Sequence, residues 1–198
     1  MNSHIKIESV LNEQTSVLIY EYLKFADKKC KAILDIDPDS YNDWEHGAYN
    51  DINVPDVFCK YSDLLIETLM ILVQPHVEQE TGLTLVPTYS YCRLYTTGSE
   101  LPKHKDRDEC EISVSLCLGY EGNPWPIYIE GTPVYMEAGD MIIYRGIEVE
   151  HWREPLEGTN HAQAFLHYND VNGPFGKTHI YDGRKFIGMP GILGKILE

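Results

Sequence analysis

The hydrophobic and polar positions of the chain follow one period before residue 82 and another after it. Between residues 11 and 34 apolar side chains recur every three or four positions, and a second stripe runs from Tyr61 to Glu80, just ahead of Gly82. This spacing places apolar residues on one side of an α-helix, and a glycine after such a stripe is a common helix end. The pattern predicts two helices, joined by a loop at residues 35–57 that is rich in Asp, Asn, Pro and Gly.

Short alternating runs replace these stripes after Gly82. Alternation bounded by turn residues is typical of strands whose two faces meet different surroundings. The predicted strands lie at residues 83–95, 110–120, 125–131, 132–139, 140–146, 149–154 and 161–170. Helices in one block and strands in the next indicate an α+β fold. We predict a double-stranded β-helix, or jelly roll, buttressed by N-terminal helices.

The length of the chain favours one domain. Its 198 residues, 43% of them hydrophobic, are enough for one well-buried core and few for two. We expect a single domain over residues 1–198, in which residues 1–82 are mainly helical support and residues 83–168 form the jelly-roll core. The turn-rich residues 169–198 are expected to wrap around it.

Charge and composition narrow the possible partners. The chain carries 31 acidic and 16 basic residues, a formal net charge of −15, which disfavours nucleic acid because phosphate binding relies on Lys and Arg. A small molecule or a peptide is the expected substrate, and the acidic flanking segments favour a basic peptide or a free amino acid over DNA. No signal peptide and no membrane-spanning run are recognised, so we expect a cytoplasmic protein. The five cysteines form no CxxC pair and are expected to be reduced thiols.

The stretch "HKD" carries the first candidate chemistry. His104 and Asp106 are two positions apart, so in an extended chain they share a face and can point at one ion. His151 follows later in "EVEH", just after the apolar strand "DMIIY". Two histidines and one carboxylate form the facial triad that leaves open positions on non-haem Fe(II).

The order of these motifs resembles the 2-oxoglutarate- and Fe(II)-dependent dioxygenases, in particular their prolyl-4-hydroxylase-like branch. The resemblance covers roughly residues 85–168, through "CRLYTTG", "HKD", "ISVSLCL", "GDMIIY" and "EVEH". It implies that His104, Asp106 and His151 bind Fe(II), and that 2-oxoglutarate and O₂ are consumed to hydroxylate a C–H bond, with succinate and CO₂ as co-products. It leaves ascorbate open as an additional reductant. Tyr95 corresponds to a tyrosine that contacts 2-oxoglutarate, unless it is a core aromatic with a bonded hydroxyl.

One position departs from the family pattern. On the strand after the distal histidine the family normally carries an Arg or Lys for the distal carboxylate of 2-oxoglutarate, and this chain has "NHA" at residues 160–162. Each candidate to replace it shares a strand face with another site residue. His161 shares a face with Gln163, Arg153 with His151, and Arg93 with Tyr95. An imidazolium can pair with a carboxylate, whereas an Arg fork grips it with two hydrogen bonds. The sequence leaves His161 and Arg153 level, and His167 either lines the same cavity or packs as an aromatic.

Two other functions remain open from the sequence. A cupin-like metalloenzyme would use the same ion without 2-oxoglutarate, and the missing Arg or Lys keeps this alternative alive. Cupins usually supply HxH at the first pair of ligands, and "HKD" does not. The other alternative is a jelly-roll module that binds metal without turnover. The pattern selects neither a particular substrate nor an oligomeric state.

Overall fold

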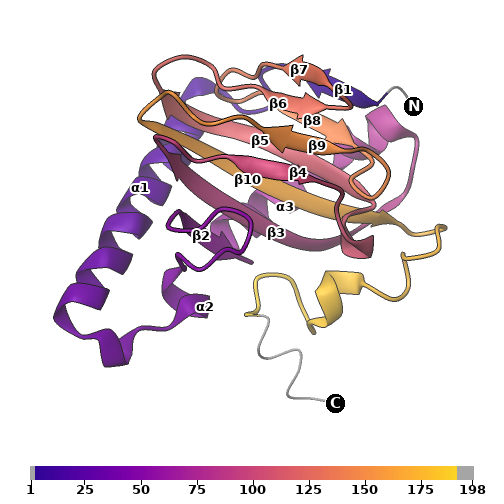
Figure 1. Ribbon diagram of the computed structural model, residues 1–198. Helices are drawn as coiled ribbons and strands as arrows, with labels where there is room; N and C mark the ends of the chain where they lie inside the picture. The colour runs from indigo at the N-terminus through magenta and orange to yellow at the C-terminus, as the bar shows by residue number, and fades with distance from the viewer. Residues whose placement is uncertain (1–2, 191–198) are drawn as a thin grey trace.

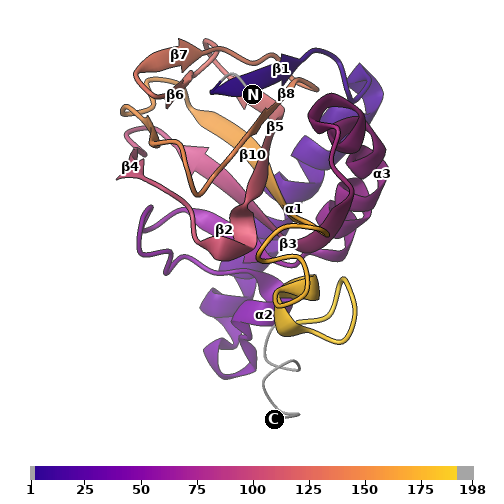
Figure 2. The ribbon, with the colours of Figure 1, turned by 90° about the vertical axis from the view of Figure 1, so that its right-hand side faces the viewer.

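Two antiparallel β-sheets face each other in the computed structural model, which describes residues 3–190 (Figures 1 and 2). The larger sheet has the order β1-β8-β5-β10-β3-β2, with bounds His4–Ile7, Met141–Tyr144, Ile112–Glu121, Asn160–Asp170, Leu85–Thr96 and Phe58–Tyr61. The smaller sheet has the order β4-β9-β6-β7, with bounds Leu101–His104, His151–Arg153, Ile127–Ile129 and Thr132–Val134. The predicted α+β jelly roll is confirmed. The end of the predicted tail, residues 191–198, lies outside the described residues.

Two long helices pack against the larger sheet, on the side away from the smaller one (Figure 2). Helix α1 spans Glu13–Ile36 and helix α3 spans Leu64–Thr81, close to the two predicted helices. Gly82 ends α3 in the left-handed conformation, with φ 70°, which a glycine adopts without a steric penalty. Within the described part of the chain, no helix is long and apolar enough to cross a membrane.

Alternation along β5 separates the main core from the interior of the jelly roll. Val114 and Leu116 belong to the hydrophobic core that α1 and α3 share with the larger sheet. Ser113 and Ser115 therefore point to the opposite face of the strand, where they make hydrogen bonds to side chains between the two sheets. The polar positions of this buried strand thus contribute to the interior of the barrel.

Three strands were not predicted, and neither were two short helical segments inside the predicted loop. Strands β1, β2 and β4 have four residues each, too few to give a clear alternating pattern. The loop expected at residues 35–57 contains a 3₁₀ turn, η1, and a short helix, α2, at Pro38–Ser40 and Asp43–His46. Tyr61 lies in β2 and not in the second helix, because the Asp63 carboxylate caps that helix and accepts two N–H groups of its first turn, at 3.0 and 3.3 Å.

The segment after β10 lies below β3 in Figure 1 and is held by side-chain contacts to α3 and β2. The guanidinium of Arg184 lies 2.7 Å from the Glu67 carboxylate of α3, and both side chains are 1% exposed. Asp182 accepts hydrogen bonds from the Tyr61 hydroxyl and, at 3.3 Å, from Arg107. These contacts bring residues 180–184, which include the 3₁₀ turn η3 at Ile180–Gly183, to the rim of the barrel.

Candidate metal centre and cavity

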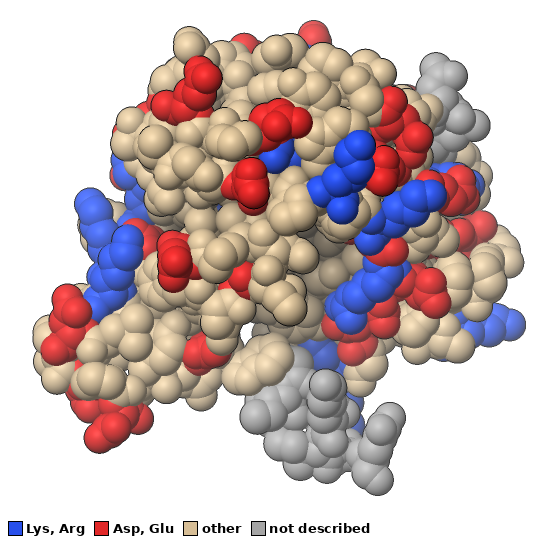
Figure 3. Space-filling model, in the orientation of Figure 1, with Lys and Arg blue, Asp and Glu red and all other residues tan. Residues whose placement is uncertain are grey.

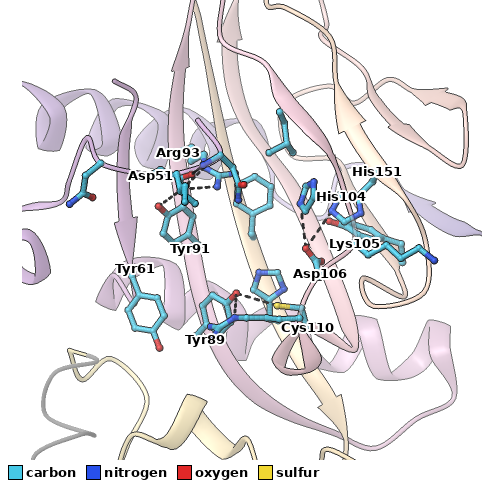
Figure 4. Close-up of a pocket in the computed structure, with 18 residues that line it drawn as sticks. Asp51, Tyr61, Tyr89, Tyr91, Arg93, His104, Lys105, Asp106, Cys110 and His151 are labelled. Atoms are coloured by element: carbon cyan, nitrogen blue, oxygen red, sulfur yellow. Dashed lines mark hydrogen bonds and ion pairs between the residues drawn. The ribbon is translucent and has the colours of Figure 1, made fainter. Parts of the chain in front are cut away.

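The three predicted ligands come together at the mouth of the barrel (Figure 4). His104 ends β4 and His151 begins β9, and the two residues are opposite each other in the antiparallel ladder. Asp106 lies two positions after His104, and its Oδ1 lies 3.6 Å from Nε2 of His104 and 3.5 Å from Nε2 of His151. All three ligand atoms lie within 4.8 Å of one another. This spacing suits one ion bound on one side by the protein.

Backbone carbonyl groups orient both imidazoles. Nδ1 of His104 lies 2.8 Å from the carbonyl oxygen of Pro102, and Nδ1 of His151 lies 3.1 Å from that of Val149. A carbonyl accepts only, so each Nδ1 carries the hydrogen and each Nε2 presents its lone pair to the centre. Burial, and then the nearby His151, lower the pKa of His104, which favours the neutral form that binds a metal.

The Asp106 carboxylate is held from several directions. Its backbone N–H donates to the carbonyl of Gly146 at 2.9 Å, and its Oδ2 accepts a hydrogen bond from the Ser113 hydroxyl at 2.8 Å. Burial acts to raise its pKa, but the interaction with His151, with smaller contributions from His167 and Ser113, holds this pKa well below its usual range. Asp106 is therefore a carboxylate and a ready metal ligand.

Arg153 is the buried cation of the barrel interior. Its side chain is 1% exposed, it lies over the Trp125 ring at 4.6 Å, and Nη1 donates to the Trp125 carbonyl at 2.6 Å. Nε and Nη2 have no hydrogen-bond partner among the described residues. Burial lowers the pKa of Arg153. Because buried polar groups are almost always paired, two free donors on one guanidinium indicate a place for an acceptor.

His161 also lies inside the barrel, but its charge and hydrogen-bonding capacity differ from those of Arg153. It is fully buried, and burial followed by the charge of Arg153 lowers its pKa to about 3, so the ring is neutral. Gln163 donates through Nε2 to the Ser115 hydroxyl at 2.8 Å, which leaves its Oε1 to accept from Nε2 of His161 at 2.9 Å. With the hydrogen on Nε2, Nδ1 of His161 is a bare acceptor. His161 therefore lacks the charge and the donor that a carboxylate requires.

Tyr95 and Arg93 lie two positions apart on β3 and contact each other. The Tyr95 hydroxyl accepts from Nη1 of Arg93 at 3.2 Å, and its ring meets Trp125 edge to face at 4.9 Å. Arg93 is neutralised by Asp51, with Nη2 at 2.7 Å and Nε at 3.2 Å from one carboxylate oxygen. The structure thus gathers Tyr95 and Arg153 around Trp125 and places Arg93 in the wall of a cavity (Figure 4).

This cavity, of about 530 Å³, opens beside the triad. Its wall includes the rings of Tyr61, Tyr89, Tyr91 and Phe165. The hydroxyls of Tyr61, Tyr89 and Tyr91 form hydrogen bonds with Asp182, Cys110 and Asp51, in that order. The cavity wall therefore presents mainly aromatic surface to a ligand. Figure 3 shows a hollow on this face with several Lys and Arg side chains on one side of it. The acidic excess of the chain is therefore not concentrated in the cavity wall, which includes Arg93, Lys105 and Arg107.

Several residues of the site escaped sequence reasoning. Ser113 contacts Asp106, and Asp51 anchors the 47–57 loop over the cavity through Arg93. Ser113 had a visible signal, since it is a polar residue in an otherwise apolar strand. Asp51 had none, because a loop aspartate does not reveal its partner. His167 lies in the wall of the cavity beside the triad, which does not include His161, and its ring also packs against Tyr89, so neither of its two predicted alternatives is singled out.

Solved structures provide the comparison. No family model matches the chain, and neither does any curated protein. A prolyl-4-hydroxylase from Pseudomonas putida matches with a TM-score of 0.63 and 14% identity, over 83% of this chain and 91% of that one. A viral collagen prolyl hydroxylase from Paramecium bursaria Chlorella virus-1, in complex with 2-oxoglutarate, matches with a TM-score of 0.60 and 12% identity, over 86% and 97%. HygX from Streptomyces hygroscopicus, with nickel, 2-oxoglutarate and hygromycin B bound, matches with a TM-score of 0.61 and 12% identity, over 86% of this chain and 84% of that one. The chain therefore has the fold of prolyl-4-hydroxylase and of other 2-oxoglutarate- and Fe(II)-dependent oxygenases.

Proposed function

We propose that the protein is a 2-oxoglutarate- and Fe(II)-dependent oxygenase that hydroxylates a C–H bond of a small molecule or of a peptide side chain. One observation carries the proposal. On the short strand β9, His151 faces a second histidine and a carboxylate, while Arg153, two positions on, extends two unpartnered donors into the same barrel. A metal centre and a buried carboxylate receptor on one strand are what this reaction requires.

The donor set of the triad fits iron. Two imidazole nitrogens and one carboxylate oxygen bind Fe(II) in oxygenases and leave further positions for a co-substrate and O₂. His104 and His151 present their Nε2 lone pairs, and Asp106 presents Oδ1, from one side only. The opposite side faces the cavity, where a substrate can approach.

The unpartnered donors of Arg153 fit the distal carboxylate of 2-oxoglutarate. Nε and Nη2 lie on one edge of the guanidinium and form the fork that binds a carboxylate through two parallel hydrogen bonds. His161, at the position where the family carries its basic residue, is neutral and presents an acceptor. We therefore propose that Arg153 takes over the role of that residue, with Tyr95 and Trp125 forming the wall around it.

Bound iron and 2-oxoglutarate would supply the oxidising chemistry, in which O₂ converts 2-oxoglutarate to succinate and CO₂ and one oxygen atom enters the substrate. The chain contributes position and surroundings. The histidines and Asp106 hold the ion, Arg153 holds the co-substrate, and the buried aromatic walls exclude water from the reacting groups.

The cavity restricts the substrate class. A volume of about 530 Å³ is within the range of small-molecule sites. Its tyrosine and phenylalanine rings favour a substrate portion with rings or aliphatic carbons, placed beside the triad. A net charge of −15 continues to disfavour nucleic acid.

The test is an anaerobic titration of the Fe(II)-loaded protein with 2-oxoglutarate, followed by the weak visible charge-transfer band of the chelate. We expect the band in the wild type, and we expect Asp106→Ala and His151→Ala to lose both iron and band while their circular dichroism is unchanged. Asp108→Ala, an exposed carboxylate two positions away, is the matched control and should behave as wild type. Iron binding without a band in the wild type would contradict the proposal and favour the cupin-like alternative.

A further inference from the structure

The two oxygens of the Asp106 carboxylate have different surroundings. Oδ1 lies 3.6 and 3.5 Å from the Nε2 atoms of His104 and His151. Oδ2 accepts a hydrogen bond from the hydroxyl of Ser113 at 2.8 Å. Ser113 is fully buried on β5, so this contact is not exchanged with water. One oxygen is thus available to the ion and the other is occupied by the protein.

A second buried residue determines where the Ser113 hydroxyl points. Its Oγ lies 3.1 Å from Nδ1 of His167 on β10 and 3.2 Å from the carbonyl oxygen of Cys110. The hydroxyl has one hydrogen, and the charged carboxylate is the stronger acceptor. Nδ1 of His167 must then donate to Oγ, and the ring is fixed for this by packing on Tyr89, with centroids 4.6 Å apart. The result is a chain of donors from His167 through Ser113 to Asp106.

The backbone closes the other side of Oδ2. A Cβ atom on Gly146 would lie 2.2 Å from Oδ2 of Asp106 and 2.5 Å from Oγ of Ser113. Oδ2 therefore lies in a narrow slot between a hydroxyl and a glycine. Rotating the carboxylate, so that both oxygens face the histidines, would break the hydrogen bond to Ser113 and leave the hydroxyl with the weaker carbonyl acceptor.

The number of oxygens that Asp106 gives to the ion decides what else can bind. A six-coordinate ion with two histidines and one carboxylate oxygen has three positions left, two for the chelating 2-oxoglutarate and one for O₂. A carboxylate bound through both oxygens would occupy the last of these. We propose that Ser113 and His167 are positioning residues that keep Asp106 a one-oxygen ligand and so reserve the position for O₂. The inference rests on the proposed function, because it presupposes iron and 2-oxoglutarate at this site.

Nitric oxide probes the reserved position directly. It binds Fe(II) where O₂ would, and the complex gives an S = 3/2 electron paramagnetic resonance signal. In the anaerobic Fe(II) and 2-oxoglutarate complex, we expect Ser113→Ala to keep iron and the visible band but to bind nitric oxide roughly tenfold to a hundredfold more weakly, as suits the loss of a hydrogen bond to a charged group. Ser90→Ala, which removes another fully buried serine hydroxyl on β3, is the matched control.

His167 variants test the second link and provide a route if Ser113→Ala does not fold. The amide of Asn can occupy the place of Nδ1, whereas that of Gln reaches the place of Nε2. We therefore expect His167→Asn to retain most of the nitric oxide affinity and His167→Gln to lose it. A wild type without the visible band would refute the proposed function. A normal band with unchanged nitric oxide affinity in Ser113→Ala and His167→Gln would refute the positioning role alone.

Discussion

Replacing Arg153 by methionine should separate the proposed co-substrate binding from metal binding. Methionine has a similar length and no charge, so it keeps the contact with the Trp125 ring and removes the two donors that have no partner. The triad residues are untouched, because the Arg153 guanidinium makes its hydrogen bond to the Trp125 carbonyl and none to a ligand. We expect Fe(II) affinity to be unchanged and 2-oxoglutarate affinity to fall.

The size of the fall follows from the two donors. A hydrogen bond to a charged group contributes about 1.5–3 kcal/mol net, so the Nε and Nη2 pair contributes about 3–6 kcal/mol. At about 1.4 kcal/mol per tenfold change, the dissociation constant of 2-oxoglutarate should rise roughly 10²- to 10⁴-fold. The protein without ligand should lose little stability, because replacing a buried cation with two unpaired donors by an apolar side chain offsets the lost hydrogen bond to the Trp125 carbonyl.

The assay is the visible-band titration, combined with thermal unfolding with and without 2-oxoglutarate. Ligand that binds only the folded state raises the melting temperature, so the wild type should be stabilised and Arg153→Met should not. Arg145→Met is the matched control, since this arginine is partly exposed and pairs with Glu148 outside the barrel. It should bind 2-oxoglutarate as the wild type does.

A dissociation constant within threefold of the wild type in Arg153→Met would refute the reasoning. If His161→Leu lost the band instead, the family position would have kept its role, and the neutral state assigned to His161 would be wrong. If Arg153→Met lost iron as well, the residue would be supporting the metal centre and not the co-substrate.

Three further changes test other parts of the structure. Gly146→Ala should force the Asp106 carboxylate out of its slot, with overpacking that costs about 1–3 kcal/mol of stability, and its weaker Fe(II) binding can be measured by competition with a chromophoric chelator. Acid should destabilise the wild type through His161, whose pKa is lowered to about 3 in the folded protein. The unfolded chain takes up this proton as pH falls below about 6.5 and the folded chain does not, so the free energy of unfolding falls by up to about 1.4 kcal/mol per pH unit. Urea unfolding at pH 7.5 and pH 5 should show a smaller fall in this free energy for His161→Leu than for the wild type. Equal falls would contradict the neutral state assigned to His161. Arg184→Met leaves the buried Glu67 carboxylate without its partner and should cost about 3–5 kcal/mol in urea unfolding, whereas a loss below about 1 kcal/mol would mean that Glu67 becomes protonated or reaches water.

The sequence was sufficient to bring together the three candidate metal ligands, which the structure places within 4.8 Å of one another. His104 and Asp106 are two positions apart and therefore share a face of an extended chain. The order of the strands around them identifies His151. The choice between Arg153 and His161 required the fold. Both lie inside the barrel, and only burial and hydrogen-bond partners show that one is a cation with free donors and the other a neutral acceptor.

Short elements and long-range partners account for most of what was missed. Four-residue strands such as β1 and β2 carry too few positions for a period, and they form because the edges of the larger sheet accept them. Tyr61 extends an apolar stripe, so only the cap at Asp63 shows where the helix begins. Ser113 lies on the face of β5 that points between the sheets, but its contact with Asp106 crosses the short 3₁₀ turn η2 at Asp108–Cys110 and leaves no periodic trace.

The described strands of the smaller sheet are all short, whereas the larger sheet combines short strands with three long ones. The strands of the smaller sheet have three or four residues, whereas β3, β5 and β10 of the larger sheet have 12, 10 and 11. Short strands make few ladder hydrogen bonds, so local opening of the native state should begin in the smaller sheet. His104 and His151 face each other across β4 and β9 within it.

An ion bound to both histidines would join these two strands at the least stable part of the barrel. Amide hydrogens of β4 and β9 should therefore exchange more slowly when metal is bound, while those of β5 and β10 change little. The ion of the proposed oxygenase would then also stabilise the mouth of the barrel, and metal depletion would expose this edge to proteases before the rest of the fold is lost.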